Sequence, residues 1–288
     1  MSRRWLVIAI PMLWLGVFFL LPFLEVARIS LVDPAISRPP YSPLFEDGVF
    51  AGDLENYTFL LGDEQLSDSL YVKAYLTSIR IAFVSTIFAL LIGYPMAYAI
   101  ARAPEPWRTI LLFLVILPFW TSFLLRVYAW IGLLKGNGVV NNILLWAGVI
   151  DQPLVMLQTD FATYVGIVYT YLPFMILPLY ANLVKLDGAL LEASSDLGAS
   201  ATATFLRVTL PLSLPGVLAG SMLVFIPAIG EYVIPALLGG PDTLMIGRVL
   251  WDEFFSNRDW PVASAVAIAM LALIVGPVLW LQKSMERG

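Results

Sequence analysis

The chain of 288 residues contains no cysteine and no histidine, and only 13% of its residues are charged. Without cysteine there are no disulfides and no thiol nucleophiles, and without histidine there is no imidazole base and no usual ligand set for zinc or haem. We therefore expect neither catalysis at a cofactor nor a metal site. Hydrophobic residues make up 60% of the sequence, and the mean hydropathy is +0.85. This composition excludes a water-soluble globular protein and indicates an integral membrane protein.

Six apolar runs are long enough to cross a bilayer as helices, which takes about 20 residues each. They are expected at residues 5–24, 81–101, 109–130, 161–184, 208–232 and 261–282. The first run follows two arginines, as a secretory signal does. It is longer than a usual signal core and no cleavage site follows it, so we expect an uncleaved helix. The sequence thus predicts an all-α membrane protein with a single transmembrane domain, residues 1–288, of six helices.

Lysine and arginine are unevenly distributed over the two sides that six spans define. Eight of them fall in the 40 positions of one side, residues 1–4, 102–108, 185–207 and 283–288. The other side holds eight in 121 positions, residues 25–80, 126–160 and 231–260. Because basic residues concentrate on the cytoplasmic side of membrane proteins, we expect both termini to be cytoplasmic. The external segment 25–80 is too long to lack structure, and we expect short helices in its acidic part.

Residues 185–207, an expected cytoplasmic loop, have the pattern of a short helix, a turn and a return to the membrane. Asp187 is suited to cap the start of a helix, and Gly198 is suited to the left-handed position after its end. Glu192 and Asp196 are four residues apart, so they share one face and can meet basic groups on a partner. Small residues that allow another backbone to approach closely accompany them: Ala193, Ser194 and Gly198. A docking surface and an ordinary amphipathic surface helix both fit this spacing.

This loop resembles the cytoplasmic signature of permease subunits in ATP-binding-cassette (ABC) importers. That signature reads Glu-Ala-Ala, three residues, Gly, nine residues, Ile-x-Leu-Pro. The chain has counterparts at the same spacing: Glu192, Ala193, Ser194, Gly198, Val208, Leu210 and Pro211. Serine replaces the second alanine and valine replaces isoleucine, which are small departures. The resemblance implies the type I ABC importer permease fold, in which this coupling loop, with Asp196 and Arg207, contacts the ATPase.

Three further segments look like the polyamine branch of this family, the permeases for putrescine or spermidine. They are residues 117–130 (LPFWTSFLLRVYAW), 230–235 (GEYVIP) and 259–265 (DWPVASA). In that family a second homologous permease, two ATPase subunits and a periplasmic polyamine-binding protein complete the complex in the bacterial inner membrane. The resemblance implies these partners besides the lipid bilayer, and no nucleic acid. Putrescine is the first expected substrate and spermidine the second.

A polyamine carries two or more ammonium groups, so its site needs carboxylates and aromatic faces. Glu231 follows an apolar run and is expected in the outer part of the bilayer beside Tyr232, and both are candidates to bind the substrate. Trp120 lies too deep in its span for an aromatic belt, whereas Tyr128 and Trp130 lie where such a belt is usual. These three aromatic residues are also candidates.

Each candidate has a structural alternative. Glu231 can be an interfacial acid that meets water, Trp120 a residue of the core, and Tyr128 and Trp130 anchors in the aromatic belt. Arg126 would repel a polyamine, so we expect its side chain to snorkel outward or to pair with an acid.

No Gly-x-x-x-x-Gly-Lys-Ser/Thr motif occurs in the sequence, so the chain is not expected to cradle the phosphates of ATP. We expect it to be no enzyme and to hold no cofactor, with ATP bound by the partner subunits. The alternative function is an ion-gradient-driven secondary transporter or a channel for small cations. Against it, the interiors of the spans hold few charged residues and no histidine for a proton relay.

Overall fold

The computed structural model describes residues 3–62 and 69–285, most of them in helices. The departure from the predicted all-α fold is a small hairpin in the expected external segment, β1 (Phe45–Glu46) and β2 (Val49–Phe50). Its turn residues Asp47 and Gly48 have φ of 50° and 81°, the left-handed conformation that two-residue hairpin loops favour. Hydropathy could not reveal the hairpin, because its signal is a two-residue turn.

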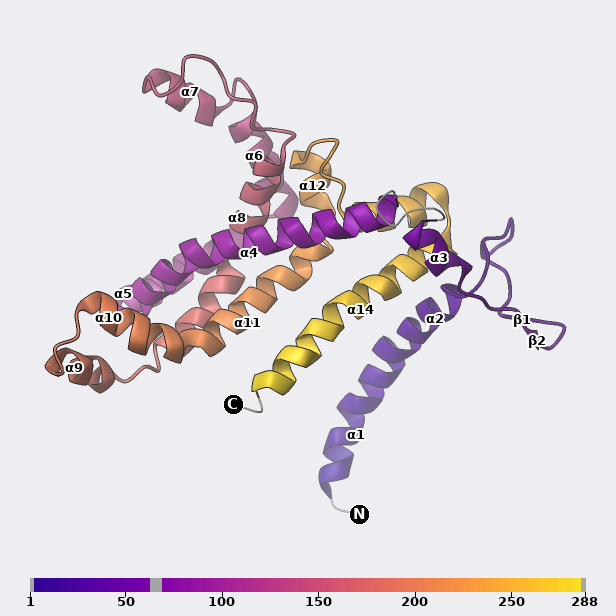
Figure 1. The fold of residues 1–288 in the computed structure, drawn as a ribbon, viewed down its shortest axis with the longest axis horizontal. Helices are drawn as coiled ribbons and strands as arrows, with labels where there is room; N and C mark the ends of the chain where they lie inside the picture. Colours follow the sequence, from indigo (N-terminus) through magenta and orange to yellow (C-terminus); the bar gives the residue numbers. More distant parts are fainter. Residues whose placement is uncertain (1–2, 63–68, 286–288) are drawn as a thin grey trace. The chain divides into compact units, whose positions relative to one another are not determined.

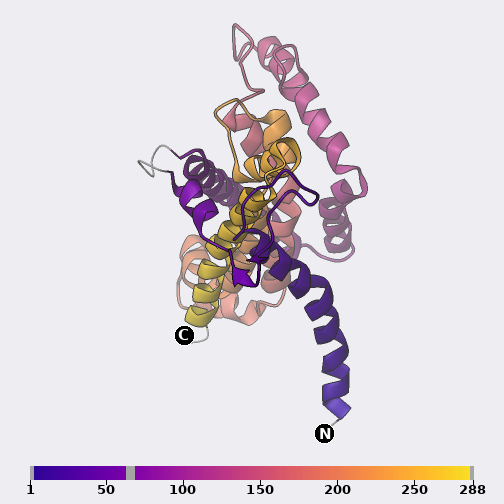
Figure 2. The same ribbon diagram turned by 90° about the vertical axis from the view of Figure 1, so that its right-hand side faces the viewer.

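The chain folds into two compact units, Met1–Tyr75 with Ile246–Gly288, and Leu76–Met245. In the first unit α1 (Arg3–Leu15), the π-helical η1 (Gly16–Leu20) and α2 (Leu21–Ile29) follow one another as an apolar helix. This helix agrees with the span predicted at 5–24. None of the side chains in its apolar window is buried within the chain. Helix α14 (Trp260–Met285) packs beside α2 (Figures 1 and 2).

Short elements complete the first unit. Helix α3 (Glu55–Leu61) lies in the acidic part of segment 25–80, as predicted. Its Asn56 is 5% exposed and donates hydrogen bonds to the carbonyls of Ser30 and Val32 at 3.2 and 2.9 Å, which holds α3 against the end of α2. The others are α13 (Ile246–Trp251) and the π-helical η4 (Asp252–Asn257).

Asp259 caps the start of α14. Its Oδ1 accepts a hydrogen bond from Val262 N at 3.0 Å, which satisfies one of the backbone donors that every helix start leaves free. Burial raises the pKa of the Asp259 carboxyl above its usual value.

The second unit is a bundle that includes most of α4 (Leu70–Arg102). Its remaining elements are α5 (Trp107–Ile116), the 3-10 turn η2 (Leu117–Trp120), α6 (Phe123–Leu134), α7 (Val139–Trp146), α8 (Asp160–Leu183), α9 (Gly188–Asp196), α10 (Ala201–Thr204), the π-helical η3 (Phe205–Thr209), α11 (Leu210–Ile229) and α12 (Val233–Leu238). Figures 1 and 2 show α9 and α10 at one end of this unit and α6, α7 and α12 toward the other.

Helices α8 and α11 approach each other closely along a seam of two glycines. A Cβ added at Gly220 would lie 2.9 Å from Met175 Sδ and 3.0 Å from Met175 O, and one at Gly216 would lie 2.8 Å from Asn182 Cβ. Glycines four residues apart let two membrane helices pack backbone to backbone. The fully buried Met175 and Val224 belong to the core that forms around this seam.

Five helices in the described part of the chain are long and apolar enough to cross a membrane: Val7–Ile29, Leu70–Arg102, Phe123–Trp146, Asp160–Leu183 and Ala201–Ile229. The predicted number of six is not confirmed. The span predicted at 261–282 lies in α14, whose apolar stretch of described side chains, Trp260–Gly276, is shorter. The span predicted at 81–101 is the end of a helix that begins at Leu70, because hydropathy marks the apolar part of a helix and not its start.

The span predicted at 109–130 is not one helix, which corrects the prediction. Helix α5 tightens into η2 and stops, and Thr121 and Ser122 are extended, with ψ of 152° and 134°, before α6 begins. Two features favour the break: Pro118 has no N–H to continue the helix, and Thr121 Oγ1 donates a hydrogen bond to Pro118 O at 2.8 Å. The span predicted at 208–232 likewise ends early, at Ile229.

Candidate functional site

Helix α9 presents an acidic, exposed surface at one end of the second unit. Asp187 caps its start by accepting a hydrogen bond from Ala189 N at 3.0 Å. Gly198, with φ of 79°, follows its end, where two backbone hydrogen bonds close the helix in a Schellman motif. Both features were predicted. The exposed residues include the acidic pair and its neighbours: Glu192, Ala193, Asp196 and Gly198. Leu197 at the tip is 88% exposed, so the loop offers apolar as well as acidic contacts.

The rest of the coupling loop leads directly into the bundle. Ser194 Oγ lies 2.9 Å from Thr204 Oγ1, so this serine joins α9 to α10. Ser200 caps α10 with its hydroxyl, as predicted. Arg207 in η3 and Pro211 in the first turn of α11 are both exposed. Helices α10, η3 and α11 form one continuous helical path from the loop to the far end of α11.

Phe205 connects this path to α4. Its ring meets Tyr94 and Tyr98 edge-on, at centroid distances of 5.6 and 6.4 Å. The Tyr94 hydroxyl in turn lies 2.8 Å from Ser213 Oγ on α11. A displacement of the loop would therefore act on α4 and α11 together. The sequence prediction missed these residues, although two tyrosines four apart on one apolar helix were a signal of a shared contact.

Glu231 lies just beyond α11 and is 8% exposed, and among the described side chains it is the one carboxylate classed as buried. Its Oε2 accepts a hydrogen bond from the Tyr171 hydroxyl of α8 at 2.5 Å. Its Oε1 accepts from Val233 N and Ile234 N at 3.1 and 3.4 Å and so caps α12. Tyr232 is half-buried at the N-cap position of α12. The carboxylate is thus held by both α8 and α12.

A row of aromatic rings links this carboxylate to the break between η2 and α6. The ring of Tyr171 is 6.1 Å from Phe174, and Phe174 meets Phe119 of η2 edge-on at 5.3 Å. The guanidinium of Arg126 lies over Phe119, with its Cζ 5.5 Å from the centroid of that ring. The same Cζ lies 5.9 Å from the centroid of the Phe123 ring. We expected Arg126 to snorkel outward or to pair with an acid, and in the described part of the chain no acid pairs with it.

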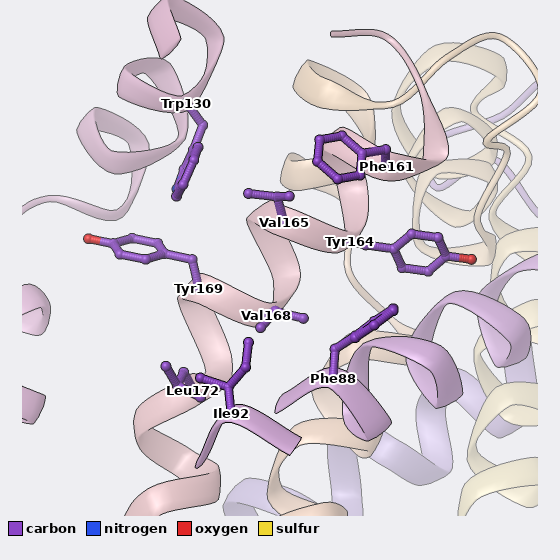
Figure 3. A pocket seen from close by; sticks show the side chains of 9 residues that line it. All are labelled: Phe88, Ile92, Trp130, Phe161, Tyr164, Val165, Val168, Tyr169 and Leu172. Atoms are coloured by element: carbon purple, nitrogen blue, oxygen red, sulfur yellow. The ribbon is translucent and has the colours of Figure 1, made fainter. Parts of the chain in front are cut away.

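Among the described residues, the hydrogen bonds of Glu231 go to Tyr171, Val233 and Ile234, and none goes to the three other aromatic candidates. Trp120 is 72% exposed and meets Phe113 edge-on at 5.1 Å, and Tyr128 is 56% exposed. Trp130 contacts Tyr169 at 5.5 Å and lines an apolar pocket of about 640 Å³ between α4, α6 and α8 (Figure 3). The side chains around this pocket are aliphatic and aromatic, so it suits hydrocarbon better than an ammonium group. The grouping of the three aromatic candidates with Glu231 and Tyr232 around a substrate therefore stays a prediction.

The sequence prediction missed Tyr171 and Phe174. These two residues connect the predicted Glu231 to Phe119 of η2. They are three apart on α8, so they project from one face of the helix, and the same span carries Glu231's hydrogen-bond donor. Their spacing was visible in the sequence. Their proximity to Glu231 was not, because it depends on the pairing of α8 with α11.

One group of carboxylates among the described residues has a spacing that a metal ion could bridge. Asp33, Asp53 and Glu55 of the first unit have oxygens within 4.8 Å of one another, and all three are exposed. Asp53 Oδ1 already accepts a hydrogen bond from Glu55 N at 2.8 Å. Exposed acidic groups of this kind are common without a metal, and the donor set gives no further indication of one.

Comparisons with known proteins agree with this architecture. Residues 89–288 match the model of the family described as binding-protein-dependent transport system inner membrane component. The chain is 42% identical over 266 residues to the spermidine/putrescine transport system permease protein PotB of Escherichia coli K12, covering 92% of this chain and 91% of that protein. The Haemophilus influenzae PotB is 40% identical over 271 residues, 93% of this chain and 88% of the relative.

Solved structures show the same fold at low sequence identity. The crystal structure of a bacterial ABC transporter involved in the import of the acidic polysaccharide alginate contains a chain with a TM-score of 0.71 and 18% identity. The superposition covers 99% of this chain and 96% of that one. The family match extends over most of the sequence and includes both the coupling loop and Glu231. The chain therefore belongs to the inner membrane components of binding-protein-dependent transport systems.

Proposed function

We propose that this chain is the permease subunit of an ATP-driven importer for polyamines, with putrescine as the first candidate substrate and spermidine as the second. The substrate class is supported by the named spermidine/putrescine permeases, which are 40% and 42% identical over most of the chain. One observation carries the mechanism: the helical path Ala201–Ile229 starts at the exposed coupling loop and ends two residues before the buried carboxylate of Glu231.

The coupling loop receives the motion of an ATPase. Glu192 and Asp196 meet basic residues of that subunit, and the small residues beside them allow close docking. Rigid-body motion of the ATPase then reaches α11 and, through Phe205, the end of α4. The passage alternates between outward and inward access as these helices move. Two ATPase subunits, a second permease and a periplasmic binding protein complete the complex, with six spans in this chain and both of its termini in the cytoplasm.

The substrate site lies between Glu231 and the break at Thr121. A carboxylate and a row of aromatic faces can replace the hydration of ammonium groups. The unwound end of η2 adds backbone carbonyls, since a half-helix that ends inside a membrane presents the negative end of its dipole. Polar groups lie at Glu231 and at this break, with apolar rings between them, which matches the alternation of ammonium and methylene groups in a polyamine.

Transport by the reconstituted complex tests the proposal. Proteoliposomes that contain both permeases and the ATPases, supplied with loaded binding protein and internal ATP, should accumulate radiolabelled putrescine or spermidine. Competing amines of graded length measure which polyamine is preferred. The chain alone should accumulate nothing, even with an imposed ion gradient. Uphill accumulation by the lone chain would support a gradient-driven transporter instead, and absence of polyamine uptake by an active complex would refute the substrate class.

A further inference from the structure

Arg126 is a cation in an unusual place. It lies in the first turn of α6, and its Nε is buried without a hydrogen-bond partner. The described residues provide no carboxylate within ion-pair distance. Its guanidinium rests over Phe119, at 5.5 Å from the ring centroid, and near Phe123 at 5.9 Å. The side chain therefore covers the break between η2 and α6.

Arg126 is half-buried, and little in the described surroundings offsets the partial desolvation of its charge. The start of a helix carries a partial positive charge, which disfavours a cation in the first turn. A buried donor without an acceptor is destabilising as well. Two features favour the observed position: the attraction between the guanidinium and the faces of the two rings, and the partial negative charge at the end of η2. Such a weakly held cation can be displaced by another cation that binds the same rings.

A polyamine needs this same aromatic surface. Phe119 is the last ring in the row that begins at Glu231 and passes through Tyr171 and Phe174. An ammonium group of a polyamine whose other end is near Glu231 would reach Phe119 along that row. In the structure the guanidinium of Arg126 occupies this position.

We infer that Arg126 is a resident cation: its guanidinium fills an ammonium subsite on Phe119 when the passage is empty, and an arriving polyamine displaces it. This inference rests on the proposed polyamine function and adds a residue that regulates the site. The consequence is a passage that keeps its own positive charge in place until a ligand with several ammonium groups arrives. A monoamine can bind near Glu231 without moving Arg126.

Equilibrium binding to the detergent-solubilised complex of both permeases and the ATPases tests the inference. Radiolabelled spermidine and butylamine serve as probes, without binding protein, so that only the membrane site is measured. Arg126→Met removes the charge but keeps a long apolar side chain. It should tighten spermidine binding by about 3- to 30-fold, the range that corresponds to the strength of cation–π contacts. Butylamine binding should change little.

Three further variants keep the result interpretable. Arg126→Lys retains a cation that can lie on the ring, and its spermidine affinity should stay near that of the wild type. Phe119→Leu removes the shared ring, so adding Arg126→Met to it should give no further gain. Arg102→Met is the matched control, because Arg102 lies over Tyr98 at the same 5.5 Å but outside the aromatic row, and it should leave binding unchanged.

Several outcomes would overturn the inference. Unchanged or weaker spermidine binding in Arg126→Met would do so, as would an equal gain for both amines or for Arg102→Met. Loss of the companion permease from the Arg126→Met complex would mean that the guanidinium pairs across a subunit interface, which also contradicts displacement. If polyamine-loaded binding protein does not stimulate ATP hydrolysis by the wild-type complex, the polyamine function itself is refuted. This result distinguishes a failure of the proposed function from a failure of the displacement of Arg126.

Discussion

Replacement of Glu231 by glutamine separates the charge of this residue from its structural contacts. The amide oxygen can still accept from Val233 N and Ile234 N, which lie 3.1 and 3.4 Å from Oε1. Its NH₂ group then faces the Tyr171 hydroxyl, which must turn and accept instead of donating. Charged hydrogen bonds contribute about 1.5–3 kcal/mol and neutral ones about 0.5–1.5, so we expect Glu231→Gln to lower the free energy of unfolding by about 1–2 kcal/mol. The complex should remain assembled.

The effect on transport should be larger than the effect on stability. If the carboxylate meets an ammonium group of the substrate, its neutralisation removes a charged contact. Polyamine-stimulated ATP hydrolysis at subsaturating substrate should then fall by about 10- to 100-fold, the equivalent of about 1.5–3 kcal/mol. Basal hydrolysis should stay unchanged. Stimulated and basal hydrolysis are measured on the same proteoliposomes, and the midpoint of thermal unfolding reports whether the fold is intact.

Tyr171→Phe is the matched control for this experiment. It removes the same 2.5 Å hydrogen bond but leaves the negative charge and the cap of α12 in place. We expect a comparable loss of stability and a much smaller loss of stimulation. Equal losses of stimulation in Tyr171→Phe and Glu231→Gln, or equal effects of Glu231→Gln on basal and stimulated hydrolysis, would show that Glu231 only supports the fold.

Three other substitutions test the coupling loop, the helix seam and the segment 147–159. Gly198→Asp should abolish co-purification of the ATPase while the chain stays in the membrane. Gly198→Asn should retain it, because asparagine is neutral and tolerates the φ of 79°. Normal co-purification of the aspartate variant would contradict the docking surface. Gly220→Val should destabilise by about 1–3 kcal/mol in a thermal-shift assay, because its Cβ would lie 2.9 Å from Met175 Sδ, and Gly132→Val, with open space at its Cβ, is the control. The Asn141 side chain donates a hydrogen bond to Leu154 O and accepts one from Leu154 N. Asn141→Ala leaves both groups unpaired, so it should lower the free energy of unfolding by about 1–3 kcal/mol and speed proteolysis between residues 147 and 159. An unchanged cleavage rate would refute this role of Asn141.

Local geometry near the coupling loop could be predicted from the sequence because each signal is local. Asp187, Gly198 and Ser200 each fix a helix end through their own side chain or backbone, and the structure has all three in the predicted roles. The spans 5–24 and 161–184 were also found, since a long apolar run is a property of contiguous residues. The family signature at this loop added an expected partner, the ATPase, which spacing alone did not identify and which stays a prediction.

Other features depend on neighbours that are distant in sequence. The break at Thr121 interrupts a run that is apolar throughout, so hydropathy gave no sign of it. The burial of Glu231 required both the start of α12 and the hydroxyl of Tyr171, sixty residues earlier in the chain. Trp130 was a candidate by residue type, and the other residues that line its pocket, from α4 and α8, are distant in sequence and could not be identified from that position.

The glycine seam between α8 and α11 bears on how this permease can be altered. Tyr171 and Glu231 are attached to two helices that are in backbone contact at Gly216 and Gly220, so these two groups are carried as a rigid pair. At the other end of the proposed substrate site, around Thr121, the backbone is interrupted and side chains such as Trp120 are exposed. If this site binds the amine, engineering of the preferred amine length should begin there, where substitutions can change the reach of the site without disturbing the end held by Tyr171 and Glu231.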